Sequence, residues 1–238
     1  MKPMTLSEVA RMAGGTLHGS DATVKGLATD TRRLRADGRP LFGALRGENF
    51  DAHDHLDREG ADRVAGVLVS RPVNAGVPEV RVADTQLALA QLAASVQAGR
   101  STRVVAITGS NGKTSVKTLL LSVLAEAFAR VHGNPGNYNN EIGLPLAVLD
   151  APEDAEVAVY EMGAGKPGDI AYLARIAVPH AALVNNIAPA HVERMGNLLA
   201  IADTKAAVYD ALPRDGVAVI NADDAFAPFF AERAHGRR

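Results

Sequence analysis

The sequence contains no cysteine, which excludes a disulfide framework and a metal site built from thiolates. It contains no run near the roughly 20 apolar residues that a membrane-spanning helix needs, and its N-terminus lacks the apolar core of a signal peptide. Its formal net charge is -2, so it lacks the excess of basic residues that nucleic-acid-binding proteins carry. These absences indicate a soluble, cytoplasmic protein with no nucleic-acid partner and no membrane insertion.

The chain is expected to fold into two α/β domains. Residues 1–83 combine short strand patterns with two helical stretches and predict a small N-terminal domain. Its strands are expected at 16–18, 24–29, 41–45, 64–70 and 80–82, and its helices after a Thr5–Glu8 capping box and over 53–59. Residues 84–100 predict a connecting helix, over 85–97, and a linker. Residues 101–238 predict a second, central domain.

In the central domain, strand and helix patterns alternate. Strands are expected at 104–107, 156–161, 181–185 and 217–221, and helices over 113–129, 169–176, 197–211 and 225–234. This alternation is typical of a mostly parallel sheet with helices on both faces. Ligands bind beyond the carboxyl ends of the strands in such sheets. The residues that follow these strands should therefore share one edge, and they are 109–114, Glu161, 185–186 and 221–223.

Residues 104–115 have the layout of a phosphate-binding loop: a buried strand, a glycine turn, Lys-Thr and a helix. Glycines at 109 and 112 allow close backbone approach to an anion, Lys113 can reach the terminal phosphates, and the Thr114 hydroxyl can ligate Mg²⁺. The residues expected to contact ATP are Thr108, Gly109, Ser110, Asn111, Gly112, Lys113, Thr114 and Ser115. The commoner, longer form of this loop needs glycine at position 107, which is Ile107. The shorter form also occurs as a simple strand-to-helix turn.

Four further groups are open to two interpretations each. Glu161 ends an apolar strand, where it can ligate Mg²⁺ or serve as a solvated acid or a helix cap. His191 fits a surface loop and Lys205 the solvated face of a helix. If the amine of Lys205 were desolvated and added CO₂, the carbamate could instead join Glu161 and His191 as ligands of a second divalent cation. The polar run 133–141 fits a plain turn cluster, or a loop whose amides contact phosphate or the acceptor substrate.

Taken together, these residues resemble the Mur ligase family. The resemblance rests on blocks 108–114, 139–145, 161–163 and 191–205, which stand in the family's order. Blocks 139–143 and 185–191 are most similar to the family member that adds D-alanyl-D-alanine. Asp30-Thr31-Arg32 and the pattern over 41–53 resemble that member's UDP-substrate domain. The resemblance covers essentially the whole chain.

The resemblance implies ATP-dependent amide formation between UDP-N-acetylmuramoyl-tripeptide and D-alanyl-D-alanine, through an acyl phosphate. The catalytic residues would be Lys113, Glu161, His191 and Lys205. Thr114 and Glu161 would hold one Mg²⁺. The second Mg²⁺ would be held by Glu161, His191 and Lys205, with Lys205 carbamylated by CO₂, a step that needs its pKa lowered.

The resemblance also implies where substrates bind. The substrate-binding residues would be Asp30, Thr31, Arg32 and Asn49, near the uridine diphosphate, together with Asn139 and Asn140. Members of the family are considerably longer and have a third, C-terminal domain. The sequence ends within what resembles the central domain.

Three other functions fit parts of the pattern. A family member that extends folate with glutamate is disfavoured by the UDP-type pattern of the first domain. A nucleotide-binding fragment without catalysis would bind ATP or a UDP ligand and release no phosphate. A P-loop kinase is disfavoured because Glu161, His191 and Lys205 would then have no joint role.

Overall fold

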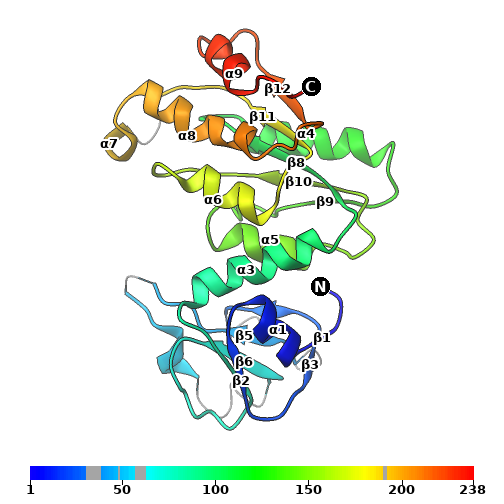
Figure 1. Ribbon diagram of the computed structural model, residues 1–238, viewed down its shortest axis with the longest axis vertical. Coiled ribbons are helices and arrows are strands. Elements are labelled where there is room, and N and C mark those ends of the chain that lie inside the picture. Colours follow the sequence, from blue (N-terminus) through cyan, green and yellow to red (C-terminus); the bar gives the residue numbers. More distant parts are fainter. Residues whose placement is uncertain (31–38, 48, 57–62, 190–191) are drawn as a thin grey trace. The chain divides into compact units, whose positions relative to one another are not determined.

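The computed structural model describes residues 1–30, 39–47, 49–56, 63–189 and 192–238 (Figure 1). The chain divides into two compact units, Met1–Val96 (unit 1) and Gln97–Arg238 (unit 2). Within the described ranges, no helix is both long and apolar enough to cross a membrane. The predicted α/β class is confirmed for both units. The predicted sites Thr31, Arg32 and His191 lie outside the described residues.

Unit 1 is built on a short mixed sheet. Its elements are β1 (Met4–Thr5), α1 (Leu6–Met12), β2 (Thr16–His18), β3 (Thr23–Val24), β4 (Leu27–Ala28), β5 (Leu41–Gly43), η2 (Ala52–His55), β6 (Gly66–Val69), β7 (Glu79–Arg81) and α3 (Thr85–Ala98), whose last two residues fall in unit 2. The sheet order is β2-β7-β6-β5-β4, in which only β2 runs antiparallel to its neighbour. The predicted capping box is confirmed: Thr5 and Glu8 exchange side-chain and backbone hydrogen bonds at the start of α1.

Two predictions for unit 1 were wrong in detail. The predicted strand 24–29 is two short strands in different sheets, because Val24 of β3 pairs with Met4 of β1, while Leu27 of β4 pairs with Leu41 of β5. The predicted helix 53–59 is a 3₁₀ turn over Ala52–His55 within the described residues. Asp51 begins that turn by accepting a hydrogen bond from the His53 N–H.

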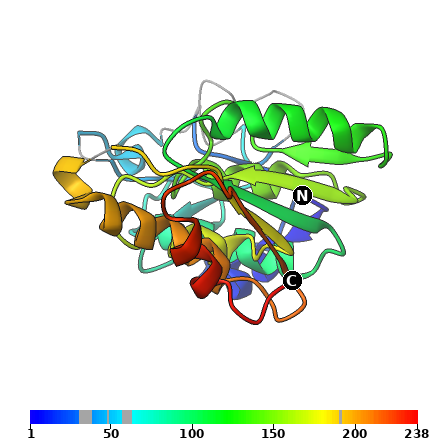
Figure 2. The ribbon, with the colours of Figure 1, turned by 90° about the horizontal axis from the view of Figure 1, so that it is seen from above.

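Unit 2 is a parallel α/β sheet with its helices. Its elements are β8 (Arg103–Thr108), α4 (Lys113–Ala125), β9 (Val131–Gly133), α5 (Gly143–Asp150), β10 (Val157–Glu161), α6 (Asp169–Ile176), β11 (Ala181–Val184), α7 (Val192–Met195), α8 (Leu198–Asp210), β12 (Val217–Ile220) and α9 (Ala227–Arg233). The strand order is β12-β11-β8-β10-β9, and every neighbouring pair is parallel. Helix α4 packs on β8, β9 and β10, whereas α8 lies on the opposite face (Figure 2). The predicted parallel sheet with helices on both faces is confirmed.

Unit 2 also corrects the sequence prediction in places. The short strand β9 and helix α5 were not predicted. The helix predicted over 113–129 ends at Ala125, because the chain turns tightly there: the N–H groups of Ala127 and Phe128 both donate to the Leu124 carbonyl.

The arrangement of unit 2 creates a switch point between β8 and β10. The connection that leaves β8 is α4, on one face, whereas the connection that leaves β10 is α6, which packs beside α8 on the other face. At such a point the two following loops separate and leave room for a ligand at the carboxyl ends of the strands. Glu161 of β10 is in register with Ile107 of β8. The loop after β8 and the end of β10 are therefore adjacent.

Candidate functional site

The loop between β8 and α4 needs its two glycines. Gly109 has a φ of +146° and Gly112 a φ of +74°, values that side-chain-bearing residues rarely adopt. A Cβ atom at Gly109 would lie 3.0 Å from Asn185 Cβ, and one at Gly112 would lie 2.9 Å from Asn185 Nδ2. Both backbone conformation and close contact with the 185 region therefore require glycine here.

Helix α4 begins with an N-terminus that suits an anion. Gly112 is the N-cap residue and provides no side-chain cap, so the first N–H groups of the helix have no such partner. Lys113 folds back over the loop, where its Nζ donates to the carbonyl oxygens of Gly109 (2.9 Å) and Ser110 (3.3 Å). Burial lowers the pKa of Lys113, and the nearby Glu161 charge opposes that shift. A phosphate oxygen would be a more strongly charged acceptor than these carbonyls.

The Glu161 carboxylate lies at the centre of the site and is almost fully buried. Its Oε2 accepts a hydrogen bond from Thr114 Oγ1 (2.8 Å), and its Oε1 accepts one from Asn139 Nδ2 (2.7 Å). Burial acts to raise the pKa of Glu161, but these hydrogen bonds and the Lys117 charge outweigh it, so the pKa is lowered. Glu161 is thus held as a carboxylate that points at the start of α4.

Two residues that the sequence analysis missed support Glu161. The buried Lys117 Nζ lies 3.3 Å from Glu161 Oε2 and donates to the Asn134 carbonyl at 2.8 Å. The Asn134 side chain binds the backbone of Glu161 on both sides, because Oδ1 accepts from its N–H and Nδ2 donates to its carbonyl. Lys117 comes three residues after Thr114 and four after Lys113, so it shares their face of the helix. That spacing is the sequence signal that could have placed Lys117 at the site.

The loop after β11, residues 185–188, forms a clamp of hydrogen bonds on the 109–112 loop. Ser110 Oγ donates to the Ala188 carbonyl and accepts from the Ala188 N–H, both at 3.0 Å. The Asn185 and Asn186 side chains donate to the Asn111 carbonyl, and Asn186 Oδ1 accepts from the Asn111 N–H. These contacts fix the shape of the 109–112 loop before any ligand binds.

The fourth strand end, that of β12, is bonded to the same loop. Asn221 Nδ2, which follows β12, donates to the Asn185 carbonyl at 2.9 Å, and Asp224 Oδ2 accepts from the Ile187 N–H at 2.7 Å. The residues predicted to share one edge do meet there. The amides of 185, 186 and 221 bind neighbouring loops.

Lys205 of α8 is buried, with 3% of its surface exposed. Burial, together with the charge of Lys113, lowers the pKa of Lys205 to about 8. Within the described ranges, no group of three or more His, Cys, Asp or Glu residues is placed to hold a metal ion.

The remaining predicted residues lie in several places. Thr108 is buried at the end of β8, and Ser115 is exposed beside Thr114 on α4. Asn140 precedes α5, and its Oδ1 accepts hydrogen bonds from the N–H groups of Ile142 and Gly143. Asp30 and Asn49 belong to unit 1, where Asp30 is half-buried and Asn49 is exposed.

The donor set at the switch point suits a magnesium–nucleotide complex. Thr114 Oγ1 and Glu161 Oε2 are hard oxygen ligands that already lie 2.8 Å apart, and Mg²⁺ prefers one or two such protein ligands plus phosphate oxygens. Lys113 and the uncapped start of α4 supply positive charge for the phosphates. These residues therefore fit both a Mg²⁺ ion and the phosphates of a nucleotide.

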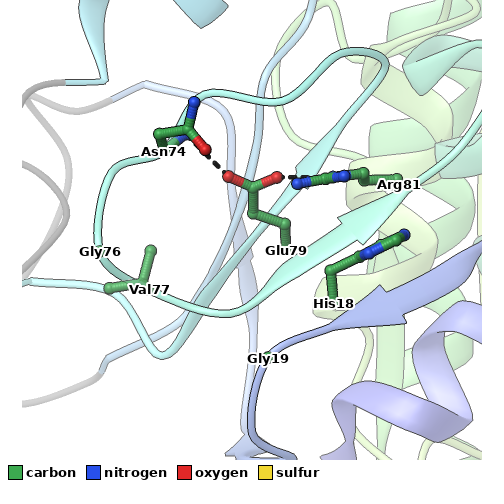
Figure 3. A pocket seen from close by; sticks show the side chains of 7 residues that line it. All are labelled: His18, Gly19, Asn74, Gly76, Val77, Glu79 and Arg81. Atoms are coloured by element: carbon green, nitrogen blue, oxygen red, sulfur yellow. Dashed lines mark hydrogen bonds and ion pairs between the residues drawn. The ribbon is translucent and has the colours of Figure 1, made fainter.

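Unit 1 contains a different polar hollow, of about 400 Å³, at the edge formed by β2 and β7 (Figure 3). The buried Glu79 carboxylate accepts from the N–H groups of Val73 and Asn74 and from Arg81 Nε. Burial acts to raise the pKa of Glu79, but the Arg81 and backbone hydrogen bonds outweigh it and lower the pKa. These contacts hold the turn at Asn74, which has a φ of +51°. Glu79 therefore has a structural role.

Comparison with known proteins agrees with this geometry. A family model described as the Mur ligase middle domain matches residues 107–238. The UDP-N-acetylmuramoyl-tripeptide–D-alanyl-D-alanine ligase of Escherichia coli is 42% identical over 224 residues, which are 94% of this chain and 49% of that relative. The ligase of the same name from Bacillus subtilis is 40% identical and covers 92% of this chain and 49% of its own length. The chain thus spans about half the length of these curated relatives.

Solved structures give the same result. The crystal structure of MurF from Acinetobacter baumannii has a TM-score of 0.92 and 32% identity, and covers 100% of this chain and 53% of its own. MurF ligase from Thermotoga maritima, in complex with ADP, has a TM-score of 0.80 and 32% identity, and covers 90% of this chain and 49% of its own.

Proposed function

Because the chain belongs to the Mur ligase family, we propose that it functions as an ATP-dependent carboxylate–amine ligase. The reaction would join D-alanyl-D-alanine to UDP-N-acetylmuramoyl-tripeptide in the cytoplasmic stage of peptidoglycan precursor synthesis. The observation that carries the proposal is the convergence of Lys113, Thr114 and Glu161 at the switch point of unit 2. The similarity to ligases named for these two substrates supports the choice of substrates.

The proposed reaction has two steps. A carboxylate oxygen of the tripeptide attacks the γ-phosphorus of ATP, the bond to the β–γ bridging oxygen breaks, and ADP leaves. The amine nitrogen of D-alanyl-D-alanine then attacks the carbonyl carbon of the acyl phosphate. Phosphate leaves with its oxygen, the amine gives up a proton, and the amide forms.

The chain's own residues would counter the repulsion between two anions. The first N–H groups of α4 would bind phosphate oxygens, and Lys113 would exchange its contacts with the Gly109 and Ser110 carbonyls for a phosphate. The clamp from 185–188 would keep the loop in shape while this exchange occurs. Preorganised charge of this kind is effective because the groups do not reorganise during the reaction.

Mg²⁺ would supply positive charge to the transferring phosphoryl group. Thr114 and Glu161 would hold one ion, and Glu161, His191 and a carbamylated Lys205 the second. The lowered pKa of Lys205, about 8, supports carbamylation because it raises the fraction of neutral amine near pH 7. Chain equilibrated with ¹³CO₂ should show a carbamate carbon signal by NMR that is lost in Lys205→Met. An unchanged spectrum in that variant would contradict the assignment.

Substrate contacts complete the proposal. Asp30, Thr31, Arg32 and Asn49 would bind the uridine diphosphate end of the first substrate. Asn139 and Asn140 would position the loop that faces the reacting groups, and the hydrogen bond from Asn139 to Glu161 supports this role.

The proposed function is tested by phosphate release from Mg·ATP with UDP-N-acetylmuramoyl-tripeptide, with and without D-alanyl-D-alanine. We expect release that requires both substrates and that falls at least about 100-fold in Lys113→Ala, the usual scale for removing a group that stabilises transition-state charge. Lys25→Ala is the matched control, since Lys25 is exposed in unit 1.

A second candidate function is nucleotide binding without turnover, for which the loop at 109–114 and the start of α4 would be sufficient. In that case calorimetry would detect binding of ADP and of the UDP substrate, while phosphate release would be absent. Absence of both release and binding would contradict the ligase proposal.

A further inference from the structure

The most deeply buried side chain of α4 is charged. Lys117 has 4% of its surface exposed, whereas the apolar Leu119 and Val123 of the same helix are 68% and 66% exposed. Burying an ammonium group costs free energy unless it is fully paired. A lysine in this position therefore requires a specific set of partners.

Those partners use every donor that Lys117 has. Its Nζ donates to the carbonyls of Asn134 (2.8 Å) and Gly136 (3.4 Å) and lies 3.3 Å from Glu161 Oε2. An ammonium carries three N–H groups, and three acceptors are present. Lys117 thus connects α4, the 134–136 segment and the end of β10.

Lys117 and Thr114 both contact the same oxygen of Glu161, Oε2. Oε2 is the same oxygen that accepts from Thr114 Oγ1, whereas Oε1 is bound by Asn139. Oε2 is therefore the oxygen at which a cation held by Thr114 and Glu161 would bind. An ammonium at 3.3 Å from that oxygen would repel such a cation.

We propose that Lys117 is a positioning residue that serves as the internal counter-charge of Glu161 and competes with a divalent cation for its Oε2. This inference rests on the nucleotide site of the proposed function. Lys117 weakens cation binding to the nucleotide-free chain and adds positive charge for nucleotide phosphates. The divalent cation consequently enters with the nucleotide, whose oxygens supply further ligands, rather than alone.

The inference predicts opposite changes in two affinities. In Lys117→Met, Mn²⁺ should bind the nucleotide-free chain about tenfold more tightly, because the competing charge has gone. The same variant should bind ADP in EDTA several-fold more weakly, because a positive charge near the phosphates has gone. A role limited to holding the 134–136 segment would weaken both affinities.

The experiment measures Mn²⁺ binding by electron paramagnetic resonance and ADP binding in EDTA by calorimetry. Wild type, Lys117→Met, Lys117→Arg and the matched control Lys25→Met are compared. Lys117→Arg should restore both affinities to within about threefold of wild type, because the charge is kept. Glu161→Gln should abolish Mn²⁺ binding in both the wild-type and Lys117→Met backgrounds, which identifies the site.

Mn²⁺ affinity that is unchanged or weaker in Lys117→Met would overturn the proposal. Because Lys117→Met leaves the buried Glu161 carboxylate without its cationic partner, Lys117→Gln is measured in parallel. It removes the charge and keeps an amide donor for the Asn134 carbonyl, and the same two directions are expected. Neither affinity requires turnover, so a chain that releases no phosphate still tests Lys117 while the ligase proposal fails.

Discussion

Two buried carboxylates, one in each unit, have similar environments and different partners. Glu79 begins β7 in unit 1, Glu161 ends β10 in unit 2, and both are about 95% buried or more. Hydrogen bonds lower the pKa of each despite burial. Glu79 is bound by two backbone N–H groups and by Arg81 of its own strand. Glu161 is bound by the side chains of Thr114, Lys117 and Asn139.

We propose that the difference in partners separates a structural acid, Glu79, from a functional one, Glu161. A backbone N–H cannot leave its carboxylate without unfolding the turn that carries it, so Glu79 stabilises one conformation. Side-chain donors can rotate, so the contacts of Glu161 can be exchanged for a cation or its ligands. Burial and a lowered pKa alone therefore do not identify a functional carboxylate.

The largest effect is expected from matched substitutions of the two acids. Glu161→Gln should weaken ADP binding in the presence of Mg²⁺ by roughly 100-fold, the upper range for perturbing a metal site. Glu79→Gln should leave that affinity within about twofold of wild type. Calorimetry with ADP and Mg²⁺ measures both affinities. Equal losses in the two variants would contradict the assignment of different roles to Glu79 and Glu161.

Glu79→Gln should instead destabilise unit 1 locally, by about 2 kcal/mol, because a buried amide donor would then face an N–H donor. The expected readout is faster hydrogen exchange at the amides of Val73 and Asn74, which donate to Glu79. Amides of unit 2 serve as the internal control. Unchanged exchange at these two positions would show that Glu79 does not hold the turn.

Removing one donor from each acid sharpens the comparison further. Thr114→Val deletes the hydroxyl that donates to Glu161 Oε2 and should weaken Mg²⁺-dependent ADP binding about tenfold. Arg81→Met deletes the donor to Glu79 Oε2 and should leave nucleotide binding unchanged. A matching loss of ADP affinity in Arg81→Met would contradict the assignment of Glu79 to structure.

The smallest effect concerns pH. The folded-state pKa of each acid lies below its ordinary value of 4.5. Each carboxylate therefore contributes stability that is fully present above pH 4.5 and is lost as the pH falls through the lowered folded-state pKa. The free energy of unfolding, measured by denaturant titration with circular dichroism, should fall more steeply below pH 4.5 in wild type than in Glu79→Gln, since the variant lacks one such group. Identical pH slopes would contradict this linkage.

The parallel sheet of unit 2 could be predicted because its strands are apolar runs that alternate with long helices. The 109–112 loop could also be predicted, because glycines, a lysine and a threonine directly follow the apolar run 104–107. The short strand β9 and helix α5 could not, because β9 has three residues and α5 begins at a glycine and contains Pro145. Tertiary pairing decides such short segments.

The partners of the candidate site residues were harder to predict. A helical lysine is usually solvated, so neither the burial of Lys117 nor that of Lys205 follows from the residue type. The two hydrogen bonds between the Asn134 side chain and the Glu161 backbone join residues 27 positions apart. Such a contact can be seen only once the fold is known. The strand-end position of Glu161 left its role open between a Mg²⁺ ligand and a solvated or capping acid, and the family resemblance favoured the first and supplied the expected role of Lys205.

The most direct test of the central claim is a crystal structure of the chain grown with ADP and Mn²⁺, with anomalous data collected to locate the manganese. The account predicts a manganese peak beside Thr114 Oγ1 and the Glu161 carboxylate, with the ADP phosphates against residues 109–114. Nucleotide bound elsewhere on the chain, or manganese that avoids Glu161, would contradict the assignment of the switch point between β8 and β10 as the nucleotide site.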